Sequence, residues 1–529
     1  MRLRITAISL ALFSLSSAAF AKPLTICTES SPEGFDVVQY NSLTTTNASA
    51  DLIFNRLVDF DATKSKVVPS LAERWEVSAD GLNYTFHLRK NVRFQTTDYF
   101  KPTRLLQADD VIFSFERMIN PNHPWAKIVG PNGFPHAQSF QLPALIKSIK
   151  KVDNNTVRFE LSKPEATFLG KLTMGFASIY SAEYADQLLK SGNAIQLNSK
   201  PIGTGPFVLK SFQKDAVVRY VANPSYFGKK TNVDRLILAI TPDSAVRVQK
   251  VKANECQIAL SPKPQEWLGL QADKAVKIVT TSSFGTAFLA INTQHKPLDN
   301  TKVRQAINLA FDQNTYLKTV FNGTATSANN PYPPSTWSYA KDLPDYPYDP
   351  AKAKKLLAEA GFPNGFDTTL WVRSSSAFTN PNPKAGAELL QADLAKIGIK
   401  AEIKTLEWGE LIKRGKAGEH DLLFMGWVGD NGDPDDFLTP QFSCAAVQSG
   451  TNFARYCDPQ LEKLIQDGQK TADIPTRTKL YVAAQKIIRD QGLWIPLAHP
   501  LNAAVTTPNV SGFKVSPFGR LDISSVVLK

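Results

Sequence analysis

The sequence has few of the residues from which hydrolytic and metal-dependent active sites are usually built. Its 529 residues include four cysteines and six histidines. The histidines are His87, His123, His136, His295, His420 and His499. They form no H-E-x-x-H motif or other paired metal spacing, and no G-x-S-x-G elbow supplies a serine nucleophile. We therefore predict that the protein is not an enzyme and holds neither a cofactor nor a metal ion.

Two further absences limit the partners that the sequence predicts. Lys and Arg outnumber Asp and Glu by 60 to 48, but no run of five or more basic residues occurs. Dispersed charge of this kind is typical of a solvated surface rather than of a nucleic-acid site. Beyond the N-terminus, no stretch reaches the roughly 18 apolar residues that a membrane span requires. We expect neither a nucleic-acid partner nor a membrane-spanning segment.

The N-terminus has the pattern of an export signal. Arg2 and Arg4 precede an apolar run from Ile5 to Leu15, and small residues follow up to Ala21. This order predicts a secretory signal peptide at residues 1–21 that is removed before Lys22. The mature protein is therefore expected to be exported and soluble.

The four cysteines are expected to form disulfides, because exported proteins fold in an oxidising compartment. Cys444 and Cys457 are close in sequence, whereas Cys27 and Cys256 are far apart. Pairing the two local cysteines leaves one long-range bond. Metal ligation is the alternative, but the chain has no C-x-x-C motif and no neighbouring histidine pair to support it.

Strand patterns dominate the first half of the chain. Asp80-Gly81 separates two alternating segments within residues 71–94, which predicts a β-hairpin. Residues 150–161 alternate again, whereas residues 52–57 and the segment from Gln107 are predicted to be helical. PIGTGPF at 201–207 predicts a turn before a strand; a phosphate loop is the alternative, but no G-K-[ST] follows.

From residue 284 the pattern changes to alternating strands and helices. Residues 284–292 predict a buried strand and residues 299–321 a single long amphipathic helix. Asp349, Pro350 and Gly361 mark the two ends of the next helix. The rest of the series is a strand at 368–372, a helix at 385–397, a strand at 400–406 and a helix from Trp408. This order predicts a doubly wound α/β domain, in which ligands bind beyond the carboxyl ends of the strands.

One loop follows the carboxyl end of such a strand. The apolar run Leu422–Val428 predicts a buried strand, and it ends at Gly429 in a loop that carries four aspartates. These are Asp430, Asp433, Asp435 and Asp436. Asp430, three residues after Trp427, is well placed to receive a cation in a partly dry cleft. The alternative is an ordinary solvated turn of Asp, Asn, Gly and Pro, and the order of the aspartates lacks the spacing and closing Glu of a calcium loop.

Long stretches of the chain resemble the dipeptide/oligopeptide-binding family of periplasmic solute-binding proteins, which serve ATP-driven (ABC) importers. The resemblance covers essentially the whole mature chain. The matching stretches include SPEGFD, LAERWEVSADGLNYTFHLRKNVRF, ADDVIFSFER, PIGTGPF, KPLDNTKVRQAI, YDPAKAKKLLAEAG, EWGELIKR, GWVGDNGDPDDF and FSCAA. Within the family the chain is most similar to the dipeptide-binding and the Sap-type antimicrobial-peptide-resistance proteins.

The resemblance implies an α/β, two-lobed fold of the type II periplasmic binding class, with an extra inserted domain. We expect lobe I at 22–54, 205–283 and 500–529, the inserted domain at 55–204 and the other lobe, lobe III, at 284–499. The same resemblance agrees with the Cys27–Cys256 and Cys444–Cys457 pairings. It also implies a periplasmic location, an inner-membrane ABC permease as partner, and a monomer.

The resemblance further implies that the lobes close on an extended peptide. In this sequence Asp430 takes the place of the aspartate that holds the peptide's α-ammonium, with Trp427, Val428 and Gly429 as the adjoining wall and backbone contacts. Asn41 falls where the family places a hydrogen-bonding residue from the opposite lobe.

One departure affects the expected ligand. Dipeptide binders hold the ligand carboxylate with an arginine, and Ala377 occupies that place here. Arg373 lies four residues earlier and either reaches the site or projects to solvent. Longer peptides, or a ligand without a free carboxylate, are therefore expected beside dipeptides.

We predict a peptide-capturing component of an importer that uses main-chain pairing and an Asp430–ammonium contact. The alternatives are the same fold with an antimicrobial peptide, haem, a polyamine or a metal chelate as cargo, and a periplasmic hydrolase or chaperone.

Overall fold

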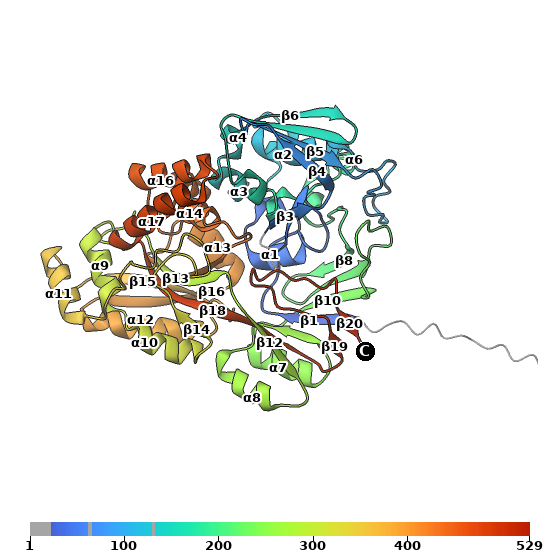
Figure 1. Ribbon diagram of the computed structural model, residues 1–529. Coiled ribbons are helices and arrows are strands. Elements are labelled where there is room, and N and C mark those ends of the chain that lie inside the picture. The colour runs from blue at the N-terminus through green and yellow to red at the C-terminus, as the bar shows by residue number, and fades with distance from the viewer. Residues whose placement is uncertain (1–22, 62–65, 130–132) are drawn as a thin grey trace, which may run out of the picture.

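The computed structural model describes residues 23–61, 66–129 and 133–529. The predicted signal peptide lies outside these residues. A 12-stranded mixed sheet extends through two large lobes, and a separate four-stranded sheet lies in a third body beside them (Figure 1). The chain thus has the predicted α/β class. No helix of the described residues has the length and apolar character that crossing a bilayer demands.

The first lobe contains one half of the large sheet, in the order β11-β1-β10-β9-β8. Its strands are β1 Leu24–Thr28, β8 Phe207–Gln213, β9 Val217–Ala222, β10 Arg235–Ile240, β11 Ile258–Leu260 and β12 Lys277–Ser282. Its main helices are α1 Leu43–Ala48, α7 Ser244–Lys252 and α8 Trp267–Ala272. Cys27 in β1 is bonded to Cys256 just before β11. This bond links two cysteines that are 229 residues apart in sequence, one in β1 and one just before the neighbouring strand β11.

The inserted body is built on an antiparallel sheet of order β4-β5-β7-β6. Its strands are β4 Ala72–Val77, β5 Asn83–Leu88, β6 Ile146–Asp153 and β7 Thr156–Leu161, and a small ribbon of β2 Val58–Asp61 and β3 Lys66–Pro69 lies before them. The predicted hairpin is confirmed, with Gly81 at a positive φ of 68° in its turn. Its helices are α2 Ala108–Ile119, α3 Pro135–Ser139, α4 Leu142–Leu145, α5 Phe168–Lys171 and α6 Ala182–Lys190.

The other lobe contains strands in the order β16-β15-β17-β13. Its strands are β13 Gly285–Ile291, β14 Ala325–Ser327, β15 Asp367–Arg373, β16 Lys400–Leu406 and β17 Leu422–Val428. Its helices are α9 Thr301–Ala310, α10 Gln313–Tyr316, α11 Pro350–Glu359, α12 Pro383–Lys396, α13 Trp408–Lys416, α14 Asp435–Phe442, α15 Cys444–Ser449, α16 Pro459–Lys470 and α17 Ile474–Asp490. The second disulfide, Cys444–Cys457, joins α15 to the segment before α16.

One strand belongs to both lobes. β18 Trp494–Thr506 pairs through its first half with β13 and β14 and through its second half with β11 and β12. Leu501 pairs with Ser282 at the end of β12, and Ala498 pairs with Ala287 near the start of β13. In Figure 1 it runs from the lobe of β13 towards the lobe of β1. β18 therefore changes its pairing partner from β13 to β12 close to residues 499–500, and the chain passes from β12 to β13 close to residues 283–284. The domain boundaries expected near these positions stay a prediction.

Three of the predicted elements differ in the structure. Residues 52–57 are not helical; the helix is α1, which begins earlier because Ser42 caps it by accepting a hydrogen bond from the Thr45 N–H. The predicted helix over 299–321 is divided, because Phe311 is extended and Asp312 caps a new helix. The sheet of this lobe is mixed rather than purely parallel, since β13 runs antiparallel to β17 and to β18.

Candidate functional site

A cavity of about 960 Å³ lies where the two lobes and the inserted body meet. The first lobe contributes Glu29 and residues of the segment Tyr40–Thr46, and the inserted body contributes His136, Gly175 and Phe176. The other lobe supplies Arg373, Ala377–Thr379, Trp408, Ile412, Met425–Val428, Asp430 and Phe453. The cavity therefore belongs to no single lobe, which suits a site that closes around its ligand.

β17 positions the predicted acidic loop at one end of this cavity. All seven of its residues pair with β13, from Leu422 with Ile291 to Val428 with Gly285. Gly429 then leaves the strand, and its N–H donates to the Phe284 carbonyl at 2.9 Å. A side chain at Gly429 would lie 2.7 Å from the Phe284 ring, so the close approach requires glycine. The next residue, Asp430, is thereby held at the cavity wall.

The opposite edge of β17 is largely open. β15 pairs with β17 only at Leu422 and Leu423. The later residues of the strand, Met425 to Val428, line the cavity instead. An open strand edge presents unpaired N–H and C=O groups that an extended chain can pair with. This edge therefore offers a backbone template directly beside Asp430.

The Asp430 carboxylate has no hydrogen-bond partner among the described residues. Its own backbone N–H donates to the carboxylate of Asp436, as does the Asn431 N–H, at 3.2 Å. The pKa of Asp430 is raised to about 6. Burial is the main cause; the nearby Arg520 acts in the opposite direction, and Asp51 adds to the rise. Burial and Asp430 itself raise the pKa of Asp436 well above its usual range. A ligand cation beside Asp430 would stabilise the ionised carboxylate and lower its pKa.

Two arginines lie behind the acidic end and are already paired. Arg520 contacts Asp51 at 2.5 Å and Asp59 at 3.1 Å, and Arg56 contacts the same two carboxylates at 3.2 and 3.1 Å. Because these cations are committed to Asp51 and Asp59, they do not neutralise Asp430 by contact. Asp430 therefore remains the charged group available to a ligand at this end.

A second charged group, Arg373, lies on the wall of the same cavity. Arg373 is the last residue of β15 and is 7% exposed. Its guanidinium stacks over the Trp408 ring at 4.4 Å, and Nη2 donates to Ser375 at 2.9 Å. Nε is buried without a partner among the described atoms, and burial lowers the pKa of Arg373 to about 10. The sequence left open whether Arg373 reaches the site or projects to solvent. In the structure Arg373 lines the cavity.

The other predicted site residues gather at the same cavity with one exception. Trp427, Val428 and Asn41 line it, and Ala377 lines it at the place expected for an arginine. The Trp427 indole N–H donates to the Asp436 carbonyl at 2.8 Å and so braces the acidic loop. Gly429 is buried behind the wall and acts through backbone geometry.

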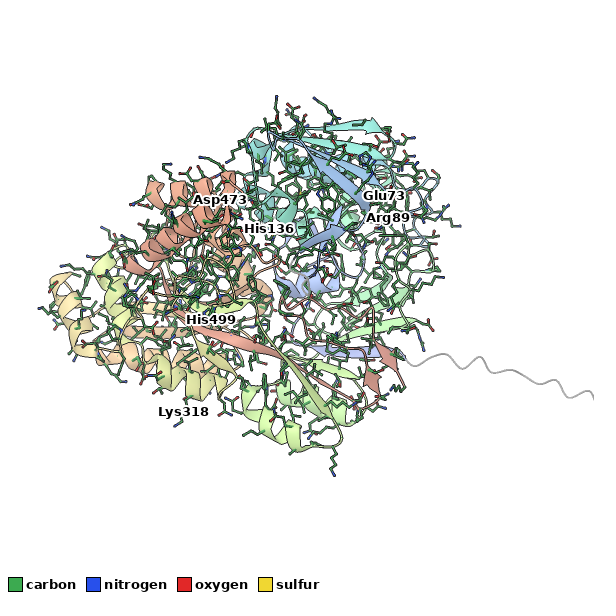
Figure 2. All side chains as sticks on the ribbon, in the orientation of Figure 1. Glu73, Arg89, His136, Lys318, Asp473 and His499 are labelled. Atoms are coloured by element: carbon green, nitrogen blue, oxygen red, sulfur yellow. A yellow bond between two sulfur atoms is a disulfide. The ribbon has the colours of Figure 1, made fainter. Side chains whose placement is uncertain are left out.

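Several wall residues carried no usable pattern in the sequence. His136 and Phe176 come from the inserted body, and Figure 2 shows His136 where that body meets the C-terminal helices. Burial and the neighbouring Lys416 lower the pKa of His136 to about 3, so its ring is neutral. Glu29 and Phe378 come from loops. Trp408 also lines the cavity and lies in EWGELIKR, one of the stretches that match the family. This match is the one sequence signal that pointed to any of these additional wall residues.

The inserted body and lobe III are joined by hydroxyl contacts. Ser139 of α3 lies 2.7 Å from Ser449 and 2.9 Å from Thr451, measured between their hydroxyl oxygens. All three side chains are buried. These contacts therefore hold the inserted body against lobe III.

The arrangement suits the binding of an extended ligand. A free carboxylate, an open strand edge and a guanidinium line one enclosed space, and these groups complement an extended zwitterion. Ser42 is one of the lining residues; its hydroxyl donates to the Glu33 carboxylate and it also caps α1.

Comparison with known proteins agrees with this geometry. Residues 66–449 match the family model described as "Bacterial extracellular solute-binding proteins, family 5 Middle". The chain is 61% identical over all 529 residues, the full length of both proteins, to "Probable di/tripeptide-binding protein 5" of Pseudomonas aeruginosa. It is also 45% identical over 93% of its length to "Heme-binding protein A" of Haemophilus influenzae, covering 90% of that protein.

A solved structure has the same fold. The dipeptide-binding protein of Pseudoalteromonas sp. SM9913 in complex with Met-Leu superimposes with a TM-score of 0.93 at 34% identity, over 96% of this chain and 100% of that one. The predicted two-lobed type II fold with an inserted domain is thereby confirmed. The family match, the full-length relatives and the shared fold agree. The chain belongs to the family 5 extracellular solute-binding proteins of bacteria.

Proposed function

We propose that the protein is the peptide-capturing component of an ABC importer, working in the periplasm as a monomer and delivering its cargo to an inner-membrane permease. The observation that carries this proposal is Asp430, a carboxylate without a hydrogen-bond partner among the described residues, on the wall of a cavity between lobes. Full-length relatives named for di- and tripeptides support peptides as the cargo class.

In this proposal the peptide's α-ammonium binds Asp430. A hydrogen bond to a charged group contributes about 1.5–3 kcal/mol to binding, and more of that is retained when water is excluded. The peptide main chain then pairs with the open edge of β17 between Met425 and Val428. Because main-chain groups are common to all peptides, this pairing gives affinity that is largely independent of side chains.

The carboxylate of a dipeptide binds Arg373, which takes over from the arginine that Ala377 replaces. Its Nη2 is held by Ser375 and its face by Trp408, so the guanidinium is oriented before the ligand arrives. Asn41 contributes a side-chain amide from the opposite lobe. Contacts from both lobes to one ligand favour the closed state over the open state, which drives closure.

Titration of the wild-type protein with Ala-Phe and with N-acetyl-Ala-Phe tests the proposal. We expect acetylation to weaken binding by at least 30-fold in calorimetry, in line with the loss of about 2 kcal/mol or more. Equal affinity for the two peptides would overturn the ammonium assignment. Peptide capture would be overturned if neither peptide binds and if mass spectrometry finds no peptide on protein isolated from its own cells.

A haem-type cargo is a second candidate, favoured by the relative named "Heme-binding protein A" and by the neutral His136 ring on the cavity wall. Titration with haemin, followed by its visible absorption, tests this candidate. A saturable Soret shift that His136→Ala abolishes would support haem; an unchanged spectrum would exclude it.

A further inference from the structure

The loop that carries Asp430 is tied to the inserted body at two points outside the cavity between the lobes. Asp435, at the start of α14, lies 3.1 Å from Lys171, the last residue of α5, measured from Oδ2 to Nζ. Earlier in the loop, the Asn431 side-chain amide donates to the Gly170 carbonyl at 3.3 Å. Asp430 directly precedes Asn431 and lies on the cavity wall. The segment that presents its carboxylate to a ligand is therefore anchored to a different body from the strand that supports it.

The ion pair between Lys171 and Asp435 is buried, with side chains 4% and 3% exposed. Each member is also held within its own body. Lys171 donates to Glu165 at 2.6 Å, and Asp435 accepts from Thr439 at 2.6 Å and from Gln469 at 3.0 Å. Although burial opposes both charges, Asp435 raises the pKa of Lys171, and Lys171 lowers the pKa of Asp435. Both groups are therefore ionised at neutral pH, and their attraction is stronger than it would be in water.

Separation of the inserted body from lobe III would affect the two charges unequally. Lys171 would keep Glu165, its partner in the same body. Asp435 would keep only neutral donors, because Lys171 is the one cation in contact with it among the described residues. The Ala166 N–H, which donates to the Gln469 carbonyl at 2.8 Å, would lose its partner as well. Because a buried pair must part before water can solvate its charges, this junction slows separation.

The junction lies outside the ligand's reach but beside the ligand's wall. Neither Lys171 nor Asp435 lines the cavity. The same two bodies nevertheless supply wall residues, with Gly175 and Phe176 from the inserted body and Asp430 from lobe III. Figure 1 shows α3 of the inserted body beside α14 of lobe III. A ligand that leaves between these bodies must first separate them.

We propose that Lys171 and Asp435 are positioning residues that latch the inserted body to the acidic loop and thereby set how slowly a bound peptide leaves. Neither residue contacts the peptide. The pair keeps the two bodies together around the cavity and holds the loop of Asp430 in place while the ammonium is bound. The inference rests on the proposed function, and it adds that release depends on a charge in α5, outside the binding site.

Asp435→Asn tests the latch, because it removes one charge, keeps the shape of the side chain and leaves Lys171 paired with Glu165. Radiolabelled Ala-Phe is bound and then chased with an excess of unlabelled peptide, and calorimetry gives the affinity. We expect release to be about tenfold faster, association to change less than twofold, and affinity to fall about tenfold, since loss of one partner of a buried charge pair acts on dissociation. Release within twofold of the wild-type rate would overturn the latch.

The matched control is Asp467→Asn, the same chemical change in the same lobe. Asp467 forms ion pairs with Lys463 and Lys470, which belong to the same helix, α16. We expect this variant to release Ala-Phe at the wild-type rate. Equal acceleration by Asp467→Asn and Asp435→Asn would show a general effect of charge on lobe III and would overturn the assignment to the pair.

Lys171→Met reaches the same pair from the inserted body and leaves the acidic loop unaltered. If the contact is direct, Lys171→Met combined with Asp435→Asn releases the peptide about as fast as Asp435→Asn alone, because the second change finds no pair left to break. Increases that multiply would show that the two residues act independently and would overturn the latch. Thermal unfolding without peptide accompanies each titration, and if Lys171→Met does not fold, Asp435→Asn decides alone.

The outcomes separate this inference from the proposed function. If wild-type protein binds no Ala-Phe, peptide capture itself fails. If wild type binds Ala-Phe and both variants release it at the wild-type rate while unfolding at lower temperature, the cavity is a peptide site and the Lys171–Asp435 pair serves stability alone.

Discussion

The acidic and the basic groups of the cavity between the lobes are held in different ways. At Asp430 the backbone is fixed by β17 and by hydrogen bonds from the Asp430 and Asn431 N–H groups to Asp436. At Arg373 the guanidinium is held by one hydrogen bond and by stacking on Trp408. Burial shifts the pKa of both groups towards the neutral form. Each charge is therefore costly in the empty cavity, and a zwitterion reduces both costs together.

The difference between the two groups assigns them different tasks. In the proposed function Asp430 sets where the ligand begins, since its backbone is fixed by hydrogen bonds and its short side chain can move little from one ligand to another. An arginine on a flexible stem beside an aromatic ring adapts its position more easily. The comparison thus predicts strict recognition of the ammonium and more tolerant recognition of the carboxylate.

The largest effect is expected from removing the acidic group. Asp430→Ala should weaken binding of a free dipeptide by about 100-fold, because a charge-assisted hydrogen bond contributes up to about 3 kcal/mol. Isothermal titration measures this loss. Asp342→Ala, at an exposed aspartate, is the control and should bind as wild type does. If Asp430→Ala binds the dipeptide within twofold of the wild-type affinity, the result contradicts both the strict recognition of the ammonium and its assignment to Asp430.

Removing the basic group should cost less. We expect Arg373→Met to weaken binding of dialanine by about 20-fold, or about 1.8 kcal/mol, in the lower part of the range of about 1.5–3 kcal/mol for bonds to charged groups. Dialanine amide should bind the variant and wild type alike, which separates a lost carboxylate contact from a general packing defect. Similar losses for both ligands would show that Arg373 acts through structure alone.

Acidification should weaken binding through Asp430. Its raised pKa, about 6, means that the carboxyl is mostly ionised at pH 7 and mostly protonated at pH 5. Because an ammonium favours the ionised form, ligand binding lowers this pKa and releases a proton in that range, and affinity should fall by about tenfold between pH 7 and pH 5. Titrations across this interval measure the fall. The Asp430→Asn variant should show a flat profile, and a steep one would assign the titration to another group.

The smallest effect is expected from the ring under Arg373. Trp408→Leu removes the cation–π contact at 4.4 Å and should weaken binding of free dipeptides by about threefold, since such contacts contribute about 0.5–1 kcal/mol. Trp408→Phe keeps an aromatic face and serves as the control. If leucine and phenylalanine give the same affinity, packing rather than charge explains the contribution of Trp408.

Sequence patterns predicted the elements whose signals are local. The Asp80-Gly81 hairpin, the helix from Pro350 to Glu359 with its cap at Asp349, and the buried run of β17 all follow from turn residues, caps and apolar periodicity. The break at Asp312 was missed, because a good N-cap residue inside an amphipathic pattern competes with continuation of the helix and only packing decides between them.

The cavity wall was predictable where one segment carries both a strand and the loop that follows it. Asp430 follows directly from the strand before it. By contrast, His136 and Phe176 reach the cavity through the placement of the inserted body, which is a long-range property. The direction of Arg373 was equally open in the sequence, since the last residue of a strand faces the cavity or solvent according to which loop covers it. The loop around Ala377 and the ring of Trp408 decide it here.

The strand that both lobes share has a consequence for how an occupied protein is recognised. Because β18 is continuous and pairs with strands of both lobes, we expect any closing motion to be a rotation about it rather than a sliding of one lobe past the other. The contacts of Ser139 with Ser449 and Thr451 join the inserted body to lobe III, and a rotation that separates these two parts would have to break them. In the proposed function, closure would therefore change the outer surface in the same way for every ligand, and a permease that recognises this shape could accept many different cargoes.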